Sequence, residues 1–240
     1  MLWSADAETT FDKLARLQLN RHSEGMPSVA FNKFESKMLK DVDRPIESHA
    51  ELGHDGPGRH GLGHITRSGV FLLCAAWELY VEELVQEVAA ILADRAASPK
   101  DLPLGAQKEL SKLVKNHSNE LKPLELAGNG WERIYLGHVG EIIGKLNTPK
   151  SGPVDELYRR LLGWENPSNT WTRGHTYIND FVKVRGDIAH RGSDAHYVRI
   201  NALRDNYRTG IPATVIEHDN AACDFVNDNS NGLQPWRRRT

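Results

Sequence analysis

The 240-residue sequence has only two cysteines, Cys74 and Cys223, which excludes a fold held by several disulfides. We therefore expect a protein of the reducing cytoplasm. Long hydrophobic runs are also lacking: the longest, Val70–Trp77, is far shorter than the roughly 20 residues that cross a bilayer. No basic segment followed by an apolar one opens the chain, so we expect no signal peptide and no membrane partner.

An excess of charge of one sign is missing as well. The net charge is -2 and the pI is about 6.6, which excludes a uniformly basic surface for nucleic acid. Phosphate binding needs clustered Lys and Arg, so any nucleic-acid site has to be a local patch. Residues 170–200 meet this condition, because they carry five basic and only three acidic side chains.

Strict alternation of apolar and polar residues is scarce, whereas apolar residues recur every three or four positions. This spacing predicts an all-α fold, a helical bundle with a long central helix. The central helix is predicted over residues 68–95, and the other predicted helices cover residues 11–17, 31–42, 107–117, 131–146, 153–163, 172–190 and 197–207. Pro45 is expected to end the second of them. Gly192 is well placed to end the helix over 172–190.

Three regions are expected along the chain. Residues 1–64 hold N-terminal helices and a loop rich in Gly and His over 43–66. Residues 65–210 form the helical core. Residues 211–240 form an extension in which 211–226 is open between helix and strand, followed by a polar, flexible tail over 227–240 that ends in three arginines and a threonine.

The Gly/His-rich loop contains two patterns that resemble binding sites. Gly56–Gly61 matches GxGxxG, but no strand precedes it, no helix begins at it, and Pro57 removes a backbone N–H that a phosphate would need. Imidazoles in such number can bind zinc, yet His49, His54, His60 and His64 lack regular helical spacing. We therefore expect a solvated loop, with no metal and no cofactor.

Residues 181–192, FVKVRGDIAHRG, hold the most informative pair of side chains, Arg185 and His190. Five residues on an ideal helix rotate by about 500°, which leaves the two roughly 140° apart. They can converge if the helix loosens near Gly186, if the arginine wraps back, or across the axis of a two-fold dimer. The plain alternative is a surface arginine and a helix-end histidine favoured by the helix dipole.

The sequence VRGDIAHRG resembles the motif of HEPN domains, an arginine followed by four to six residues and a histidine. The segment SGVFLLCAAWELYVEEL over residues 68–84 resembles the first conserved helix of the RiboL-PSP branch, in which an apolar run ends in Glu and an aromatic residue. The resemblance covers residues 65–205. Two features depart from it: some toxin members carry Tyr where this chain has Gly192, and the segment after Thr209 is not similar.

This resemblance implies a metal-independent endoribonuclease that is often dimeric, with two Arg–His motifs facing each other across the two-fold axis. The implied catalytic residues are Arg185 and His190. Asp187, a polar residue inside the motif, is expected to support them. Glu78 is expected to support them too; it follows the apolar run and faces an interface, a polar pocket or the helix edge. The candidate RNA contacts are Lys183, Arg191 and Arg67.

The implied partners are RNA, a second copy of the chain, and an antitoxin or defence-system protein. Toxin activity and anti-phage defence are the roles that fit. The alternative function is a non-catalytic HEPN-like module that binds a nucleotide, RNA or protein within a defence or toxin–antitoxin complex. A helical domain that matches the motif by chance is the plainest reading.

Overall fold

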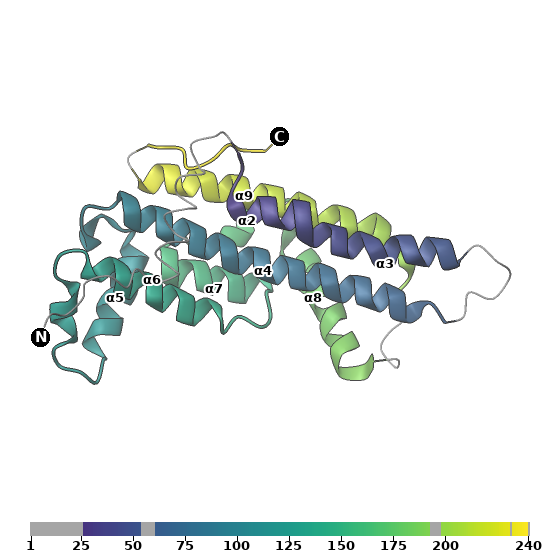
Figure 1. The fold of residues 1–240 in the computed structure, drawn as a ribbon, viewed down its shortest axis with the longest axis horizontal. Coiled ribbons are helices and arrows are strands. Elements are labelled where there is room, and N and C mark those ends of the chain that lie inside the picture. Colours follow the sequence, from purple (N-terminus) through teal and green to yellow (C-terminus); the bar gives the residue numbers. More distant parts are fainter. Residues whose placement is uncertain (1–25, 54–60, 193–197, 231, 240) are drawn as a thin grey trace, which may run out of the picture.

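The computed structural model describes residues 26–53, 61–192, 198–230 and 232–239, and helix α4 (Gly63–Arg95) is its central element. The apolar residues of α4 recur at three and four positions, and Val70, Leu73, Trp77, Tyr80 and Leu84 are completely buried. The helix is buried nearly all round in its C-terminal half, so the rest of the chain is arranged about it (Figure 1). The all-α prediction is confirmed.

Seven further α-helices surround α4 in the described part of the chain. They are α2 (Val29–Lys33), α3 (Leu39–Leu52), α5 (Leu104–Lys115), α6 (Gly130–Ile143), α7 (Ser151–Leu162), α8 (Gly174–Arg191) and α9 (Arg208–Asn229). Short 3-10 and π turns join them: η2 (Phe34–Met38), η3 (Pro99–Asp101), η4 (Lys122–Leu126), η5 (Pro167–Thr170) and η7 (Ala202–Tyr207). In Figure 1, α2, α3 and α9 cover one side of α4, while α5, α6 and α7 gather at its C-terminal end.

The centre of the bundle is an aromatic cluster around His218 of α9. The Trp171 indole N–H donates to Nδ1 of His218 at 2.9 Å, and the rings of Tyr158 and Trp164 lie 5.0 and 5.4 Å from the imidazole. Burial lowers the pKa of His218 to about 3, so the imidazole is neutral near pH 7. This histidine belongs to the core of the bundle.

Two prolines lie inside helices, which the sequence did not predict. Pro45 does not end a helix, because α3 continues through it to Leu52, and Pro212 lies inside α9. A proline within a helix costs about 3 kcal/mol, since it removes one backbone hydrogen bond. The burial of Leu39 and Val42 against α4 offsets this cost in α3.

The Gly/His-rich loop is shorter than expected, because α3 extends to Leu52 and α4 begins at Gly63. His49 is therefore a buried residue of α3, and His64 is an exposed residue of α4. His54, His60 and the pattern at Gly56–Gly61 lie, apart from Gly61, outside the described residues, as does the helix expected over 11–17. No helix in the described part of the chain is long and apolar enough to cross a membrane.

The C-terminal extension differs from its prediction in the tail, and the segment left open between helix and strand is resolved as helix. Residues 211–226 are helical, and residues 227–229 complete α9. Residues 232–239 lie against the bundle rather than detached from it: Trp236 is buried, the Arg237 N–H donates to the Met26 carbonyl at 2.9 Å, and Asn220 bonds both backbone groups of Arg239 at 2.8 Å. Burial of an indole outweighs the polar composition on which the prediction rested.

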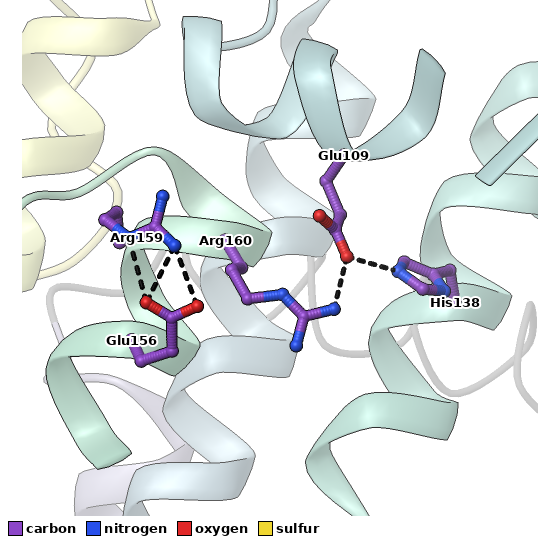
Figure 2. A network of polar contacts seen from close by, with 5 residues as sticks. All are labelled: Glu109, His138, Glu156, Arg159 and Arg160. Carbon is purple, nitrogen blue, oxygen red and sulfur yellow. Dashed lines mark hydrogen bonds and ion pairs between the residues drawn. The ribbon is translucent and has the colours of Figure 1, made fainter. Parts of the chain in front are cut away.

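Three helices at one end of the bundle meet at Glu109 of α5 (Figure 2). Its carboxylate accepts from Arg160 of α7 and is 3.1 Å from Nε2 of His138 of α6. Burial acts to raise the pKa of Glu109, but the hydrogen bonds from Arg160 and His138 outweigh it and the pKa is lowered. Glu156 and Arg159 form a separate, exposed pair on α7.

Candidate functional site

Arg185 lies on the side of α8 that faces α4, and its guanidinium is held from two directions. Nη2 donates to Oε2 of Glu78 at 3.0 Å and to the backbone carbonyl of Asn147 at 3.3 Å. The side chains of Arg185 and Glu78 are 25% and 20% exposed, so solvent still reaches the pair. The structure thus brings Glu78 to Arg185, across 107 residues of sequence.

Two further side chains of α4 affect this site. The Cys74 thiol and then Glu78 raise the pKa of Arg185, which keeps the guanidinium charged. Burial raises the pKa of Cys74, although Arg185 opposes this. Burial, with the charges of Glu78 and Glu83, raises the pKa of Glu82 to about 7. Glu82 therefore titrates near neutral pH one helical turn from the carboxylate that binds Arg185.

His190 lies in the last turn of α8 and its side chain is exposed. Gly192 caps the helix with φ of 55°, as expected of a glycine at this position. The C-terminal end of α8 projects below the body of the bundle in Figure 1. Five residues of continuous helix separate His190 from Arg185, so the two side chains lie about 140° apart around α8.

Two of the three routes by which Arg185 and His190 could converge are not taken in this structure. The helix is not loosened at Gly186, because α8 is continuous from Gly174 to Arg191. The arginine does not wrap back, because its guanidinium bonds Glu78 and the Asn147 carbonyl. Convergence across a two-fold axis is the route that this geometry leaves.

The other polar residues of the motif lie on a second face of α8. Lys183, Asp187 and His190 are spaced by four and three residues, which places them side by side. Asp187 is about 200° from Arg185, so it does not share that side chain's surroundings. Together with Lys183 it lines a groove of about 500 Å³ between α8 and residues 198–207.

The candidate RNA contacts are spread over the surface. Lys183 is exposed on α8, and Arg191 is the exposed last residue of that helix. Arg67 is half-buried on α4, about 10 Å before Cys74 along the helix axis. Lys183 therefore lies at the groove. Arg67 lies about two turns of α4 before Cys74, whose thiol is beside Arg185.

The sequence matches the RiboL-PSP-HEPN family over residues 35–224, which is most of the chain. This chain is a HEPN domain of the RiboL-PSP branch. No curated protein and no solved structure matches it. HEPN domains are often ribonucleases and often dimerise, so the family points to a nuclease-type function that involves RNA.

Sequence reasoning missed several residues that shape the HEPN site. Cys74 was expected only in the core, where it is buried, but it also lies beside Arg185. The contact of Arg185 with the Asn147 carbonyl could not be predicted from the sequence, because every residue has a backbone oxygen. The elevated pKa of Glu82 depends on burial and on neighbouring charges, and the only available hint was the presence of Glu78 and Glu83 close to it in sequence.

Proposed function

We propose that this HEPN domain is a metal-independent endoribonuclease that uses Arg185 and His190. The observation that carries the proposal is the fixed guanidinium of Arg185 on the same helix as an exposed histidine, within a family motif of that spacing. A planar, permanently charged guanidinium suits the charge that builds on phosphate oxygens. An imidazole titrates near neutral pH and can both accept and donate a proton.

In the proposed reaction, His190 takes the proton of an RNA 2′-OH, and the 2′-oxygen attacks the adjacent phosphorus. The bond from phosphorus to the 5′-oxygen breaks, and that oxygen takes a proton from His190 of a second copy. The products are a 2′,3′-cyclic phosphate and a 5′-hydroxyl. Arg185 stabilises the negative charge on the non-bridging oxygens in the transition state.

This reaction needs a homodimer, because Arg185 and His190 of one chain lie on different sides of α8. The exposed face of α4 offers an interface: Phe71, Leu72 and Leu79 are 38%, 40% and 37% exposed, and Ala75 lies between them. This face borders Glu78, so a copy seated on it approaches the Arg185 pair. We expect light scattering to give a dimer for the parent and a monomer for Leu72→Glu. A parent that is monomeric at high concentration contradicts the proposed active site.

The direct test incubates the purified protein with RNA in EDTA. We expect cleavage by the parent, a loss of about 10²–10³ in rate for Arg185→Ala, and a loss of about 10²–10⁴ for His190→Ala. Arg159→Ala and His117→Ala remove exposed residues that lie outside α8 and α4, and they serve as matched controls. Intact RNA after incubation with the folded, dimeric parent would sink the proposal.

The engagement of Arg185 by Glu78 favours a second candidate, a non-catalytic module that binds a nucleotide, RNA or protein. A guanidinium that already has a carboxylate partner can act as a structural ion pair. RNA binding without cleavage, unchanged in His190→Ala, would favour this candidate.

We also propose a role as a toxin or anti-phage defence effector that an antitoxin or defence-system protein restrains. Growth of a bacterial host tests the toxin role. We expect arrest on expression of the parent and normal growth with His190→Ala at equal protein levels. Equal growth of the two strains would contradict toxicity of the protein alone.

A further inference from the structure

The groove between α8 and residues 198–207 combines charged, aromatic and apolar side chains. Its volume of about 500 Å³ falls in the range that holds a small organic ligand. Asp180, Lys183 and Asp187 project from α8, and Arg199 and Tyr207 lie on the opposite wall. The composition therefore fits a ligand that has both an apolar ring and polar groups.

The groove carries four charged side chains, two acidic and two basic. Among the residues that the structure describes, Asp180, Lys183, Asp187 and Arg199 form no ion pair, in contrast to Glu78 with Arg185 or Glu109 with Arg160. Lysine and arginine bind phosphate oxygens. Carboxylates only accept hydrogen bonds, so Asp180 and Asp187 require a ligand with N–H or O–H donors.

Tyr207 provides an aromatic wall near one carboxylate. Its ring contacts that of Phe181, with centroids 5.0 Å apart, and the ring is only half-buried. Burial and the nearby charge of Asp180 raise its pKa, so the phenol is neutral at pH 7. A base that stacks on this ring would lie in the same groove as the Asp180 carboxylate, whose charge acts on the phenol.

The acceptor character of a carboxylate distinguishes the four bases. Guanine carries two adjacent donors on one edge, N1–H and N2–H₂, and can bond both oxygens of a carboxylate. In adenine and cytosine the amino donor is next to a ring nitrogen that accepts, and in uracil the N3–H lies between two carbonyls. A carboxylate repels these acceptors, and each good bidentate contact discriminates strongly between bases.

We propose that this groove is a subsite for a guanosine nucleotide of the RNA substrate. The guanine stacks on Tyr207 and bonds Asp180, and Lys183 and Arg199 bind the phosphates on its two sides. The inference deepens the proposed ribonuclease function and rests on it for the identity of the substrate. Because the groove lies on the same face of α8 as His190, the bound guanosine is a neighbour of the cleaved nucleotide in the RNA.

The test compares oligoribonucleotides that differ at one position. Binding is measured by fluorescence anisotropy with the His190→Ala protein, in which cleavage is expected to be slow enough for the RNA to stay intact during the measurement. We expect an RNA with one guanosine to bind at least about 10-fold more tightly than the same RNA with adenosine. Inosine keeps N1–H and lacks the amino group, so it should fall between the two. This comparison of three RNAs requires no substitution in the groove, so it does not depend on whether a groove variant folds.

Variants then locate the site. Asp180→Asn is expected to abolish the preference for guanosine, and Tyr207→Leu to weaken binding of every RNA that contains guanosine. Asp228→Asn changes an exposed aspartate of α9 and is the matched control. Equal binding of the guanosine and adenosine RNAs, or a preference that survives Asp180→Asn, would overturn the inference.

Two outcomes separate this inference from the proposed function. RNA cleavage with no preference for guanosine contradicts the subsite and leaves the ribonuclease proposal standing. A preference for guanosine that depends on Asp180, without any cleavage by the parent protein, supports the subsite and contradicts the ribonuclease. Guanosine monophosphate is tested beside the RNA: binding of the free nucleotide alone would overturn the assignment to RNA.

Discussion

Arg185 and Glu78 illustrate how one pair of side chains sets the chemistry of its neighbours. The carboxylate of Glu78 holds the guanidinium in place, and it also adds to the negative charge that raises the pKa of Glu82 to about 7. Removal of the charge at Glu78 should therefore change the pKa of Glu82.

We expect Glu78→Gln to lower the pKa of Glu82, because it removes one of the two negative charges that raise it. Glu82 then loses its proton at lower pH. Carboxyl NMR of the parent and the variant measures this directly. Glu35→Gln, on the exposed side of η2, is the matched control. An unchanged titration of Glu82 in Glu78→Gln would mean that burial and Glu83 set its pKa without Glu78.

The same substitution should lower the rate of RNA cleavage, since the side-chain amide that it introduces offers Arg185 a neutral acceptor in place of a charged one. A guanidinium that is positioned less firmly stabilises the transition state less well. We expect a smaller loss than in Arg185→Ala. A rate equal to that of the parent would show that Glu78 does not position Arg185.

At the scale of helices, glycine is required where the backbones of two helices lie too close together for a Cβ atom. The N-terminal turn of α5 lies against the end of α7: a Cβ on Gly105 would lie 2.5 Å from Cα of Gly163 and 2.6 Å from the Arg159 carbonyl oxygen. Backbone atoms of a packed helix end cannot move aside easily. Gly137 of α6 has no atom within 4 Å of its Cβ position.

We therefore expect opposite effects from two glycine-to-alanine changes. Gly105→Ala should destabilise the protein by about 1–3 kcal/mol through overpacking. Gly137→Ala should stabilise it by up to about 1 kcal/mol through helix propensity. Urea unfolding of both variants measures the free energy of unfolding. Equal effects of the two changes would contradict the close contact between α5 and α7.

Sequence periodicity predicted the helices with long apolar stripes, including α4 and α8, because burial of one face produces that spacing. It was wrong at Pro45, where tertiary packing outweighs local preference, and it left 211–226 open between helix and strand. The motif residues Arg185 and His190 could be picked from the sequence. Their surroundings could not, because the rotation along α8 does not specify that Glu78 faces one side and Tyr207 the other.

At the scale of the whole molecule, the buried carboxyl of Asp219 links folding to pH. It accepts a hydrogen bond from Ser28, and burial raises its pKa to about 7. The folded protein therefore keeps this proton up to about pH 7, whereas an unfolded aspartate loses it near pH 4. The stabilisation is present in full below about pH 4, and it is lost as the pH rises through about 7.

We expect Asp219→Asn to remove this dependence, because the amide stays neutral. The variant should be more stable relative to the parent at pH 8 than at pH 5, so the difference in free energy of unfolding, variant minus parent, should be larger at pH 8. Urea unfolding at both values measures it. Both proteins keep His218, whose lowered pKa makes stability change with pH in the opposite direction. The difference between their unfolding free energies therefore reports Asp219 alone. A difference that is constant with pH would contradict the assignment.

The hydrogen bond between Arg237 and Met26 means that the described chain nearly closes into a ring, because these positions lie 211 residues apart in sequence and in contact in space. A gene that joins residue 239 to residue 26 through a short Gly/Ser linker, and starts a new chain at Gly61, should therefore yield a circularly permuted protein with the same helical content. Circular dichroism and thermal unfolding measure the outcome. An unfolded permutant would contradict the expectation that the fold tolerates this closure together with a break at Gly61.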